Sequence, residues 1–60
     1  MSSEAVDIVI DTFEDEKEAA KHMHKCARNL RRRHLTYRYG VFIEQRRGAW
    51  WLMLHDRGTA

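Results

Sequence analysis

Residues 50–54 read Trp-Trp-Leu-Met-Leu, and this stretch decides the fold because it is apolar on both faces of a β-strand. Successive side chains of a strand point to opposite sides of the sheet, so Trp50 and Trp51 lie on different faces. A strand that is apolar on both sides is typical of the interior of a sheet. The stretch therefore predicts a central strand.

The residues before this strand predict its hairpin partner. From Leu35 to Gln45 the apolar residues alternate with a period of two, which is typical of a strand. This alternation places Tyr37 and Tyr39 in the core or at an interface. The segment Arg46-Arg47-Gly48 then forms a short turn, in which Gly48 can adopt positive φ.

The N-terminal half predicts one further strand and one helix. Residues 5–10 alternate and are rich in β-branched side chains, as in a strand. The helix is expected from Asp15, a capping residue, to Arg33. Small and apolar residues at helical spacing form the stripe that faces the sheet: Ala19, Ala20, Met23, Cys26, Ala27 and Leu30.

These elements predict a single α+β domain over residues 1–60, with the order β-α-β-β and one amphipathic helix packed on a three-stranded sheet. A right-handed crossover makes the first two strands parallel, and the third fits between them, which gives the sheet order 1-3-2. The helix covers one face only. The other face is predicted to be an interface, because it carries uncovered apolar residues: Val9, Phe42, Trp51 and Met53.

Charge is sorted along the chain. The first 18 residues contain seven acids and one base, whereas the remainder contains ten bases and two acids, and the net charge is +2. Acids at the start of a helix and bases at its end also stabilise the helix dipole, so part of this sorting has a purely structural explanation. The bases exceed what capping needs, and Arg outnumbers Lys eight to three.

The cations predict a surface for a polyanion. Arginine suits bidentate contact with phosphate, and a local basic field selects partners more strongly than net charge does. The alternative for the arginines is a solvated helix end. The residues expected to contact nucleic acid, or else an acidic protein surface, are Lys21, His24, Arg28, Arg31, Arg32, Arg38, Arg46 and Arg47.

Catalytic and metal sites have little support in the sequence. The two serines are both in the first three residues, and no Gly-rich phosphate loop is present. Cys26 falls in the apolar stripe, which favours a buried thiol over a nucleophile. His22 and Cys26 are four residues apart on the helix, but no convergent set of four zinc ligands accompanies them. We expect no enzyme activity, no metal and no cofactor.

The sequence shows neither a secretory signal nor a segment long and apolar enough for a membrane span, so a cytoplasmic protein is expected. A chain of 60 residues buries a small core, which favours a homodimer. The leading hypothesis is a non-enzymatic homodimer that binds nucleic acid. The alternative is an inhibitor or adaptor, of the kind that phages and mobile elements encode, that binds a protein through the exposed aromatic sheet face.

Overall fold

The central position of the apolar strand is confirmed by the computed structural model, which describes residues 5–58. The elements follow in the order β1 (Val6–Phe13), α1 (Glu16–Arg32), β2 (Tyr39–Arg46) and β3 (Ala49–Asp56). The strands form one sheet in the order β1-β3-β2, and β3 is antiparallel to both neighbours. Residues 1–4 and 59–60 of the predicted domain lie outside the described residues.

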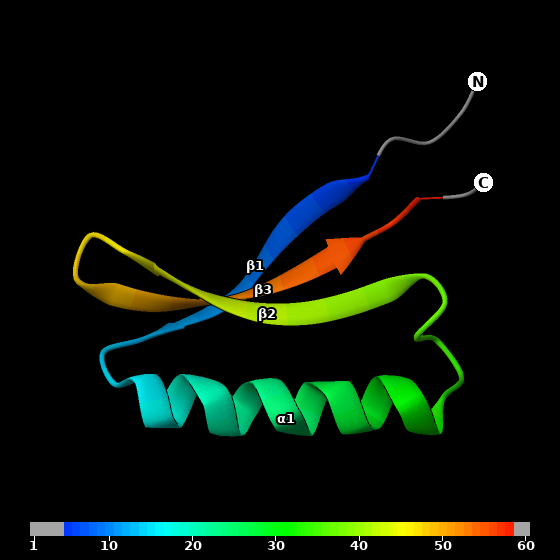
Figure 1. Ribbon diagram of the computed structural model, residues 1–60, viewed down its shortest axis with the longest axis horizontal. Helices are drawn as coiled ribbons and strands as arrows, with labels where there is room; N and C mark the ends of the chain where they lie inside the picture. The colour runs from blue at the N-terminus through cyan, green and yellow to red at the C-terminus, as the bar shows by residue number, and fades with distance from the viewer. Residues whose placement is uncertain (1–4, 59–60) are drawn as a thin grey trace.

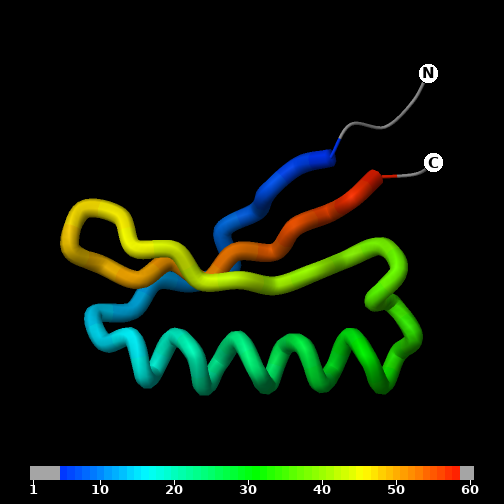
Figure 2. Tube along the Cα trace, in the orientation of Figure 1, coloured from blue at the N-terminus to red at the C-terminus, as the bar shows by residue number. Residues whose placement is uncertain are grey.

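The molecule has two layers. The helix α1 runs along one face of the twisted sheet, and no described element covers the other face (Figure 1). We call this second face the open face. The start of β1 and the end of β3 lie side by side at one end of the sheet (Figure 2), where Val6 pairs with Asp56.

The helix begins and ends close to the predicted residues. Asp15 is the N-cap, and its side chain accepts a hydrogen bond of 3.1 Å from the backbone N–H of Lys17. The acids Glu16 and Glu18 lie in the first turn, and Arg31 and Arg32 lie in the last turn, as the helix dipole favours.

The core is thin. The buried apolar residues are Ala19 in α1 and Leu52 and Met53 in β3, at 0%, 2% and 4% exposure. The small side chain of Ala19 lets α1 approach the sheet, and Leu52 and Met53 bury opposite faces of the central strand. Most other apolar residues of β2 and β3 are only half-buried.

The first strand is longer than predicted and contains a β-bulge. The pairing of β1 with β3 shifts between Val9 and Asp11, which leaves Ile10 as the extra residue. Pairing resumes at Asp11, and the strand continues beyond the predicted end at residue 10 to Phe13. Phe13 stacks on His22 of α1, with 4.7 Å between the ring centroids, so the end of β1 faces the helix.

The segment between α1 and β2 corrects the predicted start of the second strand. The strand begins at Tyr39 rather than at Leu35, and Tyr37 is 74% exposed. Tyr37 is therefore not a core residue, and its place at an interface stays a prediction. The alternation of apolar residues begins at Leu35, but the backbone N–H of Leu35 donates a hydrogen bond to the carbonyl of Leu30 and so belongs to the end of the helix.

The helix ends in a Schellman motif that has histidine where glycine is usual. The backbone N–H of His34 donates to the carbonyl of Arg31, and that of Leu35 donates to the carbonyl of Leu30. His34 has φ of 58°, in the left-handed region that disfavours a side chain. The hairpin turn after β2 also uses the left-handed region, because Arg47 and Gly48 have φ of 51° and 77°.

Replacing His34 by glycine is expected to stabilise the protein by about 0.5–1 kcal/mol, because glycine adopts the left-handed region without steric strain. Urea unfolding followed by circular dichroism measures the change. The control is His24→Gly in the middle of α1, where glycine should destabilise by about 1 kcal/mol. A loss of stability in His34→Gly would show that the imidazole itself is needed at the helix end.

No helix of the described residues 5–58 is both long and apolar enough to cross a membrane.

Candidate nucleic-acid interface

The cations of α1 gather on its solvent side. Lys21, His24, Lys25 and Arg28 line one hollow on the helix, and His24, Arg28 and Arg31 line a second with Ala27. The two hollows share His24 and Arg28, so they form a continuous surface. Arg32 falls four residues after Arg28 on the same side. We call this surface the basic face and define it by six residues: Lys21, His24, Lys25, Arg28, Arg31 and Arg32.

One member of the basic face was not among the residues expected from the sequence. Lys25 follows Lys21 by four residues and precedes Arg28 by three, and this spacing places all three on one side of a helix. The signal was therefore present in the sequence. It was overlooked because His24 continues the same spacing from Lys21 to Arg28.

The five lysines and arginines of the basic face are available for a ligand. Within residues 5–58 none of them takes part in an ion pair, and all five are exposed. From Lys21 to Arg32 they extend over about 16 Å of helix, at 1.5 Å per residue. This length places several cations within reach of one stretch of phosphate backbone.

Arg38 does not join the basic face. Its guanidinium Nε lies 3.3 Å from Asp56 Oδ1 and its centre lies 5.3 Å from the ring of Tyr39. A hydrogen bond from the Gly58 backbone N–H, together with Arg38, holds the pKa of Asp56 below its usual value. The hydrogen bond and charge of Asp56 raise the pKa of Arg38 in turn. Arg38 thus connects the start of β2 to the end of β3.

Arg46 and Arg47 lie at the hairpin and also apart from α1. Arg46 forms an ion pair of 2.8 Å with Glu44, and its guanidinium lies 5.5 Å from the centre of the Trp51 ring. Arg47 occupies the turn itself and is exposed. Of the eight residues expected to bind nucleic acid, the structure therefore brings together the five on α1 and separates the three that follow it.

The predicted interface residues do share the open face. Met53 pairs with Val9 of β1 on one side and with Phe42 of β2 on the other. Trp51 lies two residues before Met53 in β3, so the two side chains are on the same face. Their exposure is uneven, because Met53 is buried, Phe42 and Trp51 are half-buried, and Val9 is 44% exposed. Large neighbouring side chains on the same face already protect Met53.

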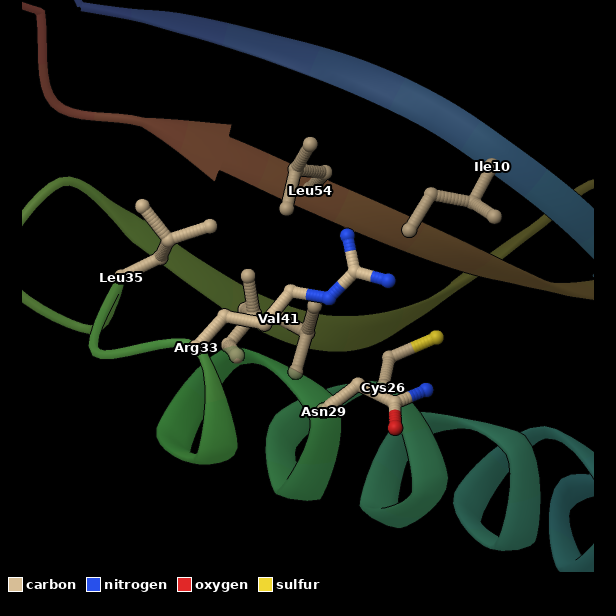
Figure 3. Close-up of a pocket in the computed structure, with 8 residues that line it drawn as sticks. Ile10, Cys26, Asn29, Arg33, Leu35, Val41 and Leu54 are labelled. Carbon is tan, nitrogen blue, oxygen red and sulfur yellow. The ribbon is translucent and has the colours of Figure 1, made fainter.

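A cavity of about 350 Å³ lies between the second half of α1 and the sheet (Figure 3). Apolar residues from the sheet and the helix line most of it, including Ile10, Leu30 and Leu54. The side chain of Arg33 extends from the end of α1 into the space between helix and sheet. Arg33 therefore faces the sheet and does not contribute to the basic face.

Cys26 lines this cavity and is half-buried rather than fully buried. Within residues 5–58 no group of three or more His, Cys, Asp or Glu side chains is close enough together to hold a metal ion.

Comparison with known proteins gives no relative: the chain matches no protein-family model, no curated protein and no solved structure.

Proposed function

We propose that this protein is a non-enzymatic cytoplasmic binding protein that contacts the phosphate backbone of nucleic acid through the basic face of α1. The observation that carries the proposal is the row of five exposed cations on one side of α1, none of which takes part in an ion pair within residues 5–58. The other predicted cations Arg38 and Arg46 each have an acidic partner within the fold, so they support the proposal less than the cations of the basic face do.

The basic face suits the backbone of nucleic acid better than its bases. Four of its six residues, Lys21, Lys25, Arg28 and Arg32, lie along one side of the helix at intervals of three and four residues, and lysine and arginine side chains commonly contact phosphate oxygens. Base recognition in the major groove uses Asn or Gln for adenine and Arg or Lys for guanine. The basic face contains no Asn or Gln, and its lysines and arginines lie in a row that suits successive contacts with phosphate. We therefore expect binding with little dependence on sequence.

The salt dependence of binding tests the proposal. Each neutralised phosphate releases counterions, so five contacts give a slope of log K against log salt of about −4.5 for duplex DNA and about −3.5 for single strands. Fluorescence anisotropy with labelled DNA and RNA between 50 and 200 mM salt measures this slope. A slope near zero, or no binding at the lowest salt, would refute phosphate contact.

A pull-down from lysate with and without nuclease separates this proposal from the adaptor hypothesis. Loss of all bound material after nuclease treatment supports nucleic acid as the direct partner. A stoichiometric protein that remains bound after nuclease treatment, in a protein that retains no nucleic acid, would favour the adaptor instead. In that case the open face, which carries Phe42 and Trp51, is the surface to mutate first.

A further inference from the structure

The exposed apolar surface of this protein is concentrated on β1. Four of the five large apolar residues that are most exposed belong to this strand: Val6, Ile8, Val9 and Ile10, at 44–49% exposure. Alternate residues of β1 point to opposite faces, so the strand is exposed on both sides. The helix packs mainly over β2 and β3 and leaves β1 largely uncovered.

The outer edge of β1 is also open. In the order β1-β3-β2 the strand pairs with β3 on one side only. Natural proteins protect such edges with Lys, Pro or a charged side chain that points inward, because a free edge pairs with other strands. Residues 6–10 contain neither Lys nor Pro, and Asp7 is hydrogen-bonded to His55 of β3 at 2.7 Å. The bulge disturbs the edge only beyond Val9.

We propose that β1 pairs with β1 of a second copy of this chain, antiparallel and in a register centred on Ile8, so that two sheets join into one of six strands. A two-fold axis perpendicular to the sheet keeps opposed side chains on the same face, so the register must be centred on a residue. In the proposed register Ile8 opposes Ile8, and Val6 opposes Ile10. Each of these pairs is apolar.

The neighbouring registers are unfavourable. A register centred on Asp7 places the two Asp7 carboxylates directly opposite each other, which is destabilising. A register centred on Val9 opposes Asp7 with Asp11 and extends through the bulge, where regular pairing is interrupted. The proposed register opposes Asp7 with Val9, and its paired segment, residues 6–10, ends at Ile10, the residue that forms the bulge. The sequence of β1 is thus self-complementary in one register.

A second copy would cover less exposed apolar surface on the open face than at β1. Met53 is already 4% exposed, and Phe42 and Trp51 are half-buried with Arg46 over the Trp51 ring. Stacking of two open faces would also leave Ile8 and Ile10 in water, because both point to the helix side of the sheet. Pairing of β1 instead satisfies backbone groups and brings these apolar residues together.

The joined sheet would carry both helices on one face. With strands about 4.8 Å apart and each helix over β2 and β3, the two helices lie roughly 20 Å from each other. Both basic faces then point to the same side of the dimer. The pairing itself does not depend on nucleic acid, so it stands or fails separately from the proposed function.

Charge complementation tests the register. Sedimentation velocity at micromolar concentration should show a dimer for the wild type and monomers for Ile8→Lys and for Ile8→Glu, each folded by circular dichroism. An equimolar mixture of the two variants should restore the dimer, because Lys and Glu then oppose each other. Tyr37→Lys, which alters an exposed residue outside β1, just before the strand at the opposite edge of the sheet, should remain dimeric. A monomeric wild type would overturn the proposal.

Disulfide trapping covers the case in which the charged variants fail to fold. In a Cys26→Ala background, Ile8→Cys should form a disulfide-linked dimer on mild oxidation, because the two residues oppose each other. Ile10→Cys is the matched control on the same strand and face, and its two copies would be about 13 Å apart. Trapping at residue 10 rather than 8, or a monomer produced by Trp51→Glu while Ile8→Lys stays dimeric, would refute β1 pairing.

Discussion

Replacing Arg28, Arg31 and Arg32 together by glutamate is expected to abolish binding to DNA and RNA without unfolding the protein. The change removes three of the five cations of the basic face and adds three negative charges. All three side chains are exposed and have no ion-pair partner within residues 5–58, so the fold loses no contact of that kind. From the salt slope, two remaining contacts would leave affinity several hundred-fold or more below that of the wild type at low salt.

A matched pair of double variants separates the basic face from the net charge. Arg28→Glu with Arg31→Glu and Arg46→Glu with Arg47→Glu change the net charge by the same amount. Binding measured by anisotropy at 50 mM salt should fall far more in the Arg28→Glu, Arg31→Glu variant than in the Arg46→Glu, Arg47→Glu variant. An equal loss of binding in the two double variants would mean that the overall charge, rather than the surface of α1, attracts the polyanion.

Replacing Leu52 by alanine is expected to lower the free energy of unfolding by about 2–5 kcal/mol. Leu52 is 2% exposed and is the largest fully buried side chain of the described residues. It lies in the middle strand, where it pairs with Asp11 of β1 and Ile43 of β2, so a neighbouring strand lies on each side of the space that its removal leaves. A domain of 60 residues has about 3–9 kcal/mol of stability in total, so this variant loses much of it.

Urea unfolding at fixed protein concentration measures the effect, since self-association would otherwise shift the midpoint. Tyr37→Ala serves as the control, because Tyr37 is 74% exposed and its truncation should change stability by less than about 0.5 kcal/mol. A loss below about 1 kcal/mol in Leu52→Ala would show that the two layers do not form a packed core around β3.

The topology followed from the sequence because two patterns agreed. The run at residues 50–54 is apolar on both faces, and only a central strand can bury both. The helix is apolar along one side only, so it can pack against the sheet in one orientation. The strand order β1-β3-β2 and the cap at Asp15 are the direct results. The clustering of the α1 cations was predictable for the same reason, since helical spacing alone places them together.

Other features depend on contacts that no local pattern contains. The extension of β1 to Phe13 depends on β3, which is eight residues long and continues to offer backbone partners, and the bulge at Ile10 is visible only in the register of that pairing. The ion pairs of Arg38 and Arg46 depend on tertiary placement, so these two arginines looked the same in sequence as those of α1. The exposure of β1 depends on how far one helix extends across three strands, which composition does not reveal.

The tight turn at Arg47 and Gly48 has a consequence for the order in which the chain folds. It joins β2 and β3 through a two-residue loop, so this hairpin can close within microseconds, and α1 forms locally on a similar timescale. β1 must instead find β3 across almost the whole chain, since Val6 pairs with Asp56. Closing that long loop costs more chain entropy than closing the hairpin, so we expect β1 to pair after the hairpin has formed.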